Sequence, residues 1–151
     1  MAQRLEVQVS YAARRPWVPR RSQFDMWARA AVTAGGRPNV LSVRVVGAAR
    51  SRALNARYRH KNRPTNVLSF RGAGHAPDGR HYLGELVICA PVVAREAKLA
   101  AKSRESHWAH MTVHGVLHLL GFDHEHDAES RKMAAREVQI LDRLGFSDPY
   151  A

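Results

Sequence analysis

Three histidines and one glycine within eleven residues constrain this chain more than any other feature. His114, His118 and His124 stand at offsets of zero, four and ten, and Gly121 lies between the second and the third. Residues four apart in an α-helix share one face, and glycine readily adopts the left-handed conformation that ends a helix. The spacing therefore predicts a helix that carries His114 and His118, ends at Gly121, and lets the chain fold back with His124.

Three histidine ligands leave a fourth position of a zinc ion open, which is the pattern of catalytic rather than structural zinc sites. We therefore expect one Zn²⁺ per chain, held by His114, His118 and His124 at the end of a central helix. Two further histidines, His107 and His110, lie on the same helix. Residues eight apart in a helix are about 12 Å apart along its axis, so His110 and His118 cannot share one ion in a straight helix. We expect His107 and His110 to support the site, to be satisfied in the core or to face substrate.

The histidine spacing is that of the long zinc-peptidase motif, but the residue that serves those enzymes as general base is missing. Their motif places glutamate directly after the first histidine, whereas this chain has Gly115 there. A glycine inside a helix costs roughly 1 kcal/mol relative to alanine. Its benefit is close approach, either of a substrate or of another backbone.

Basic residues are concentrated in the first half of the chain. The 151 residues carry a net charge of +11. Residues 1–77 hold 15 Lys and Arg against two acidic residues, a net charge of +13, and residues 78–151 have a net charge of −2. Twenty of the 24 basic residues are arginine, which contacts phosphate in a bidentate manner. We therefore expect a polyanionic partner, most simply nucleic acid, bound by the N-terminal half.

Length and composition favour one globular domain over residues 1–151. No apolar run approaches the ~18 residues of a membrane span, so no membrane partner is expected. The chain has one cysteine, Cys89, which excludes an internal disulfide and fits a reducing cytoplasm.

Hydrophobic periodicity and turn residues indicate a mixed order of strands and helices, which leaves α+β and α/β architectures open. Strands are expected at 5–10, 40–46, 66–70 and 83–90. Helices are expected at 22–33, with Ser22 as N-cap, at 48–59, from 91 onward, at 105–120 and at 128–144.

The histidine motif and several further blocks resemble the YbeY family of bacterial endoribonucleases, also called rRNA maturation factors. The blocks occur in the family's order and span nearly the whole chain. They are residues 114–124, Leu54-Asn55-x-x-Tyr58-Arg59, the segment Pro-Thr-Asn-Val-Leu-Ser-Phe at 64–70, Leu-Gly-Glu-Leu-Val-Ile at 83–88 and Gly-Phe-Ser-Asp-Pro-Tyr at 145–150. Many members have Asp where this chain has Asn66, which argues against a mechanism that needs a carboxylate at that position.

The resemblance implies a small α+β domain with a four-stranded mixed sheet and a zinc ion bound by the three histidines. It also implies cleavage of single-stranded RNA, maturation of the 3′ end of small-subunit rRNA and a role in ribosome quality control. The expected partners are single-stranded RNA and the small ribosomal subunit, without DNA. The resemblance further points to Arg59 as a catalytic residue, able to neutralise charge on the phosphate.

The residues alone leave two other functions open. A zinc-dependent peptidase-like hydrolase would share the ligand spacing, although Gly115 and the basic N-terminal half argue against it. A non-catalytic RNA-binding assembly factor with a structural zinc is the other alternative. No residue is forced as general base by the sequence; Asp123 and Glu85 are candidates.

Overall fold

The computed structural model describes the chain apart from residues 1–4, 33–38, 73, 75–77 and 123–124. Its elements alternate irregularly between strand and helix, as the sequence patterns predicted. In chain order they are β1 (Leu5–Tyr11), α1 (Arg21–Ala31), β2 (Asn39–Val46), α2 (Ala48–Arg59), β3 (Val67–Arg71), β4 (His81–Cys89), α3 (Ala90–Leu99), α4 (Arg104–Leu119) and α5 (Asp127–Arg143).

The four strands form one mixed sheet in the order β1-β2-β4-β3. β1, β2 and β4 run parallel, and β3 pairs antiparallel with β4 at the edge. The expected four-stranded mixed sheet in a single small α+β domain is thereby confirmed. Among the described residues, β3 therefore has a strand partner on one side only.

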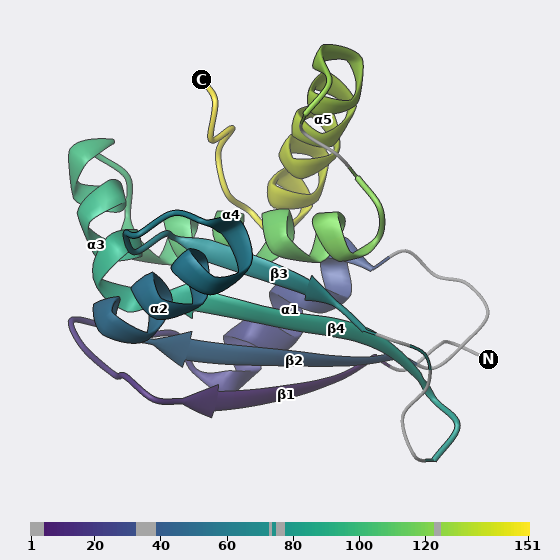
Figure 1. Cartoon of the computed structure of the whole chain (residues 1–151). Coiled ribbons are helices and arrows are strands. Elements are labelled where there is room, and N and C mark those ends of the chain that lie inside the picture. The colour runs from purple at the N-terminus through teal and green to yellow at the C-terminus, as the bar shows by residue number, and fades with distance from the viewer. Residues whose placement is uncertain (1–4, 33–38, 73, 75–77, 123–124) are drawn as a thin grey trace.

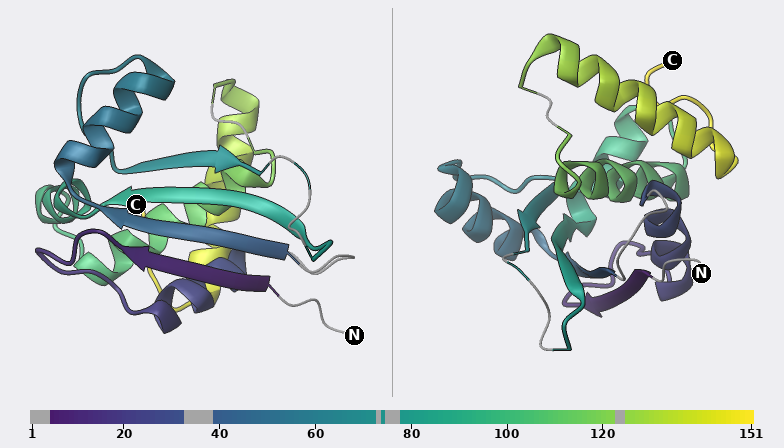
Figure 2. Two further views of the ribbon diagram at one scale, coloured as in Figure 1. Left: turned by 60° about the horizontal axis from the view of Figure 1, so that its bottom comes forward. Right: turned by 90° about the vertical axis from the view of Figure 1, so that its right-hand side faces the viewer.

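Helices cover both faces of the sheet, but unequally. α1 and α4 pack on one face, α2 lies on the other, and α5 stands on the outer side of α4 (Figure 1, Figure 2). Strand residues alternate accordingly: Leu86 and Ile88 enter the large core beneath α1 and α4, whereas Val87 and Cys89 enter a smaller apolar cluster on the α2 face. Cys89 is fully buried, in accord with a packing role.

α4 is the central helix and ends as the glycine at 121 predicted. Gly121 has φ of 103°, and two backbone hydrogen bonds close the helix end, from Gly121 to His118 and from Phe122 to Leu117. This pairing is the Schellman arrangement, in which a left-handed glycine redirects the chain. The last turn of α4 therefore presents His118 directly before a sharp reversal of the chain.

Two local expectations were wrong. α1 begins at Arg21 rather than after Ser22, because the Gln23 side chain accepts a hydrogen bond from the Arg20 backbone N–H, 2.8 Å long, at the preceding position. The helical spacing of Val113, Val116, Leu117 and Leu120 predicts one apolar stripe that faces the core. Of these residues Leu120 is 38% exposed, since it follows the last helical residue. No helix among the described residues is long and apolar enough to cross a membrane.

Candidate metal centre and its cleft

α4 brings two of the three predicted metal ligands together. The Nε2 atoms of His114 and His118 lie 3.2 Å apart, as their spacing of one helical turn requires. Two nitrogens that are each 2.0–2.1 Å from a tetrahedral zinc ion are roughly 3.3 Å apart. The pair therefore fits two ligands of one ion. The third predicted ligand, His124, lies outside the described residues.

A buried carboxylate from α5 orients His114. Glu137 is 1% exposed, and its Oε1 lies 3.1 Å from His114 Nδ1. Burial by itself would raise the pKa of Glu137, but hydrogen bonds from His110 and His114 outweigh it and lower the pKa to about 2. An ionised carboxylate only accepts hydrogen bonds, so His114 carries its proton on Nδ1. The unprotonated Nε2 of His114 then faces His118 Nε2 and can act as a metal ligand.

The other carboxylate oxygen of Glu137 is shared by two donors. His110 Nε2 lies 2.5 Å from Oε2, and the Tyr150 hydroxyl donates to the same atom over 2.8 Å. Burial and the negative charge of Glu137 raise the pKa of Tyr150, so its hydroxyl stays protonated. His110, His114 and Glu137 form the one group of three in the described part of the chain whose ligand atoms could hold a metal ion. The 2.5 Å separation is a hydrogen-bond length, however, and is well below the ~3.3 Å expected between two zinc ligands.

A cleft of about 1040 Å³ opens beside the histidine pair, between α4, β3 and the end of α2. Its wall includes both His114 and His118. Four basic side chains line the same cleft: Arg59, Lys61, Arg63 and Arg71. All four belong to the strongly basic half of the chain, so the N-terminal half contributes the positive rim and the C-terminal half contributes the histidines.

Arg59 ends α2 and is exposed at the cleft. Its guanidinium donates a 3.3 Å hydrogen bond to the Ser69 carbonyl and lies 6.0 Å from the centroid of the Phe70 ring. Arg59 of α2 thus contacts β3. Ser69 of β3 in turn donates a 3.2 Å hydrogen bond from Oγ to the carbonyl of Gly115 in α4. The predicted catalytic arginine and the histidine pair therefore border one cleft.

Gly115 allows α4 to lie close to the sheet. A Cβ at this position would be 2.7 Å from Leu86 Cδ2 and 3.3 Å from Ser69 Oγ. Of the two benefits considered from sequence, the structure shows close approach to the sheet rather than to a substrate. The position that carries the general base of zinc peptidases therefore points into the core here.

Other candidate residues lie elsewhere. Glu85 forms an ion pair with Arg44, 2.8 Å between Oε1 and Nη2, and is absent from the lining of the cleft. Asn66 does line the cleft, but its Nδ2 donates to Glu96 at 3.1 Å and its Oδ1 accepts from the Val67 backbone N–H. These two contacts of Asn66 fix the start of β3. Asp123, the other candidate base, is outside the described residues.

The two support histidines differ in their partners. His107 Nε2 lies 2.9 Å from Glu96 Oε1, on the α3 side of α4. His110 bonds Glu137 and contacts Tyr150 at 3.3 Å between Nε2 and the hydroxyl. Their expected supporting or core role fits these contacts.

Sequence reasoning missed Glu137 and Tyr150. A signal existed for Glu137, because it falls in the buried stripe of α5 with Met133, Ile140 and Leu141. A carboxylate in such a stripe requires buried donors. Tyr150 offered only its place in the terminal block at 145–150, and its partner is thirteen residues away in another element.

Comparisons with known proteins place this chain among relatives of similar sequence. The family model described as Endoribonuclease YbeY matches residues 21–145. The Endoribonuclease YbeY of Nitrosococcus oceani is 44% identical over 150 residues, which cover 97% of this chain and 97% of that protein. The Endoribonuclease YbeY of Stenotrophomonas maltophilia is 48% identical in an alignment that covers 98% of this chain and 94% of that protein.

The fold is also similar to a solved structure. The solution structure of TM1509 from Thermotoga maritima aligns with a TM-score of 0.57 at 21% identity, covering 91% of this chain and 88% of that one. At this identity the likeness concerns the fold alone.

Proposed function

The chain belongs to the YbeY endoribonuclease family, and from this premise we propose a zinc-dependent endoribonuclease that cleaves single-stranded RNA. Its proposed role is maturation of the 3′ end of small-subunit rRNA and ribosome quality control in the cytoplasm, with the small ribosomal subunit as partner.

One observation carries the proposal: an oriented histidine pair and a basic rim share one cleft. His114 and His118 offer two Nε2 atoms 3.2 Å apart, and Arg59 lines the same wall. RNA cleavage needs a Lewis acid at the phosphate and donors for the charge that develops on it. A metal site inside a cationic cleft meets both needs.

We assign His114, His118 and His124 as the zinc ligands and Glu137 as their support. Imidazole suits zinc, and three protein ligands leave a position for substrate or water. Metal-binding histidines almost always donate their other N–H to a carboxylate or carbonyl, as His114 does to Glu137. The rival set of His110, His114 and Glu137 would require the 2.5 Å hydrogen bond between His110 and Glu137 to open.

Each described residue then has a distinct part in the reaction. Zinc, when bound, supplies Lewis acidity at the phosphoryl group. The guanidinium of Arg59 neutralises charge on the phosphate, for which its planar fork of N–H donors is suited. Lys61, Arg63 and Arg71 hold the flanking phosphates along the cleft. Their attraction is independent of base sequence and falls with added salt.

The peptidase alternative has little support in the geometry. Its general base would occupy position 115, where a side chain would collide with Leu86 in the core. The alternative of a non-catalytic assembly factor with a structural zinc predicts metal binding without RNA cleavage. A cleavage assay can therefore decide between an endoribonuclease and an assembly factor.

The deciding experiment compares three forms of the full chain: metal-stripped, reconstituted with zinc, and reconstituted His118→Ala. Each is incubated with single-stranded RNA, with the same RNA annealed to its complement, and with DNA of the same sequence. We expect cleavage of single-stranded RNA by the zinc-loaded wild type alone. Zinc binding without cleavage of any substrate would favour the assembly factor. A precursor of small-subunit rRNA with an extended 3′ end then tests the biological substrate.

A further inference from the structure

The C-terminal tail folds back onto the start of α4. After α5, Gly145 adopts φ of 89°, and backbone hydrogen bonds from Gly145 to Asp142 and from Phe146 to Leu141 turn the chain. Phe146 then packs edge-on against Trp27, with ring centroids 6.3 Å apart. The tail is thus redirected by the same device that ends α4.

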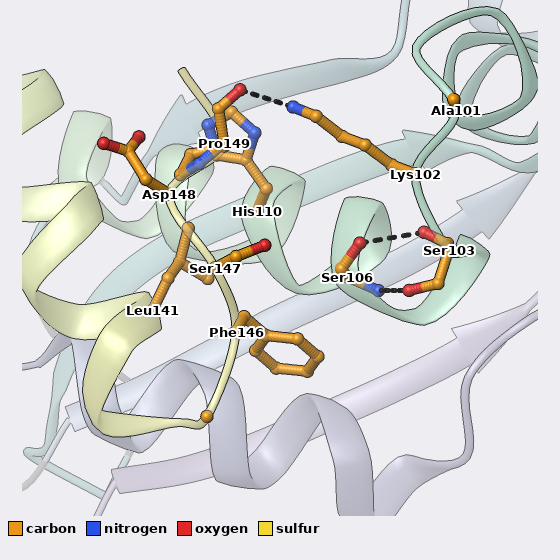
Figure 3. Close-up of a pocket in the computed structure, with 11 residues that line it drawn as sticks. Ala101, Lys102, Ser103, Ser106, His110, Leu141, Phe146, Ser147, Asp148 and Pro149 are labelled. Carbon is orange, nitrogen blue, oxygen red and sulfur yellow. Dashed lines mark hydrogen bonds between the residues drawn. The ribbon is translucent and has the colours of Figure 1, made fainter. Parts of the chain in front are cut away.

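Polar contacts fix the rest of the tail. Lys102 donates from Nζ to the Pro149 carbonyl over 2.5 Å, and the Tyr150 backbone N–H donates to Asp148 Oδ1 over 2.8 Å. Figure 3 shows Lys102 reaching Pro149, and both line a cavity of about 310 Å³ together with His110. The position of Tyr150 is therefore set by one anchor within the tail and one in the segment just before α4.

The tail places one hydroxyl on the carboxylate that orients the metal-binding histidine. Tyr150 is 55% exposed, so it contributes little apolar burial. Its hydroxyl nevertheless reaches Oε2 of the almost fully buried Glu137 at 2.8 Å. The opposite oxygen, Oε1, holds His114 Nδ1 at 3.1 Å.

We propose that Tyr150 is a positioning residue of the metal centre: its hydroxyl holds the Glu137 carboxylate in the rotamer that directs His114 Nε2 into the cleft. This inference rests on the proposed metal site. Tyr150 bonds the Glu137 oxygen opposite the one that holds His114, and it is absent from the lining of the cleft. It therefore acts through Glu137 rather than on RNA. Removing a partner that orients a metal ligand typically weakens metal binding about 10–100-fold.

The test removes the hydroxyl alone. Tyr150→Phe keeps the ring, and its matched control is Tyr11→Phe, which removes a hydroxyl that donates to the Pro19 carbonyl over 2.7 Å, away from the histidines. Zinc affinity is measured by competition with a chromophoric chelator, and unfolding of the metal-free proteins is measured in parallel. We expect Tyr150→Phe to bind zinc about tenfold more weakly, and Tyr11→Phe to bind like wild type.

Two further readouts separate positioning from general stability and from catalysis. In the metal-free wild type, ¹⁵N NMR of the imidazoles should show His114 protonated at Nδ1, and in Tyr150→Phe a mixture of tautomers. Excess zinc should restore the RNA cleavage rate of Tyr150→Phe, because Tyr150 does not touch substrate. Zinc affinity of Tyr150→Phe within twofold of wild type would overturn the inference while leaving the proposed function intact. Failure of the wild type itself to bind zinc would overturn both.

Discussion

Replacing Glu137 by glutamine tests the metal centre most sharply, because it changes charge and donor pattern without changing shape. The native carboxylate accepts from three donors: His110 and Tyr150 on Oε2, and His114 on Oε1. A carboxamide keeps one acceptor oxygen and gains an NH₂ group. The orientation that keeps two of the three bonds places the NH₂ group against His114 Nδ1.

Two donors cannot bond, so His114 in the Glu137→Gln protein moves its proton to Nε2. That nitrogen is then no longer available to zinc. When the Glu137→Gln protein binds zinc through Nε2, His114 therefore lacks the hydrogen bond to the charged Glu137 carboxylate that it has in the wild type, worth about 1.5–3 kcal/mol. Every 1.4 kcal/mol is about tenfold in affinity, so zinc binding should weaken by roughly 10–100-fold, in line with the effect of lost orienting partners elsewhere.

Chelator competition measures this zinc affinity, and Glu96→Gln is the matched control. Glu96 also lies at hydrogen-bond distance from a histidine of α4, with Oε1 2.9 Å from His107 Nε2, but it has no contact with His114. We expect the control to bind zinc within twofold of wild type. Equal zinc affinity for Glu137→Gln and wild type would refute the reasoning that Glu137 selects the tautomer of His114.

Four other outcomes are expected. Because Arg59 is exposed, Arg59→Ala should keep zinc and melt within a few degrees of wild type. With saturating single-stranded RNA it should cleave at least about tenfold more slowly, which corresponds to roughly 1.4 kcal/mol in the barrier. Weaker RNA binding at an unchanged saturated rate would instead make Arg59 a residue that only anchors RNA. His118→Ala should abolish stoichiometric zinc in metal analysis, whereas retention would point to the rival cluster around His110 and Glu137. Gly115→Ala should lower the free energy of unfolding by about 1 kcal/mol, because overpacking against Leu86 at about 1–3 kcal/mol exceeds the helix gain of roughly 1; a rise in melting temperature would contradict the close packing. The hydrogen bond from His107 lowers the pKa of Glu96 below its ordinary 4.5, so this carboxylate stabilises the fold above that pH and the contribution disappears as the pH falls through the folded-state pKa. Unfolding of Glu96→Gln should accordingly depend less on pH in the acid range, and parallel curves for the two proteins would disprove the linkage.

Local features of the chain were readable from the sequence because their causes are local. The helix at 48–59 has the predicted bounds, and Gly121 takes the predicted left-handed conformation. One helical turn is sufficient to bring His114 and His118 together, whatever the rest of the fold does. The position of Arg59 at a helix end also followed from local pattern, since the predicted helix at 48–59 ends at this residue.

Features that depend on distant partners required the tertiary structure. The sequence shows a glycine at 115 but not that Leu86, on a strand 29 positions earlier, fills the space beside it. It shows a glutamate in the buried stripe of α5 but not which groups satisfy it. The tautomer of His114 is therefore a tertiary property, because its Nδ1 partner is 23 residues away in α5.

What the sequence by itself determined is the histidine pair, the turn after it, the order of strands and helices, and the concentration of positive charge. What only the tertiary structure decided is that β3 takes the edge of the sheet, that Arg59 and the histidines line one cleft, and that Tyr150 reaches Glu137. The physical reason is the range of the interactions. Helix periodicity and glycine conformation act within a few residues, whereas a buried carboxylate takes its donors from whichever elements the packed core brings beside it.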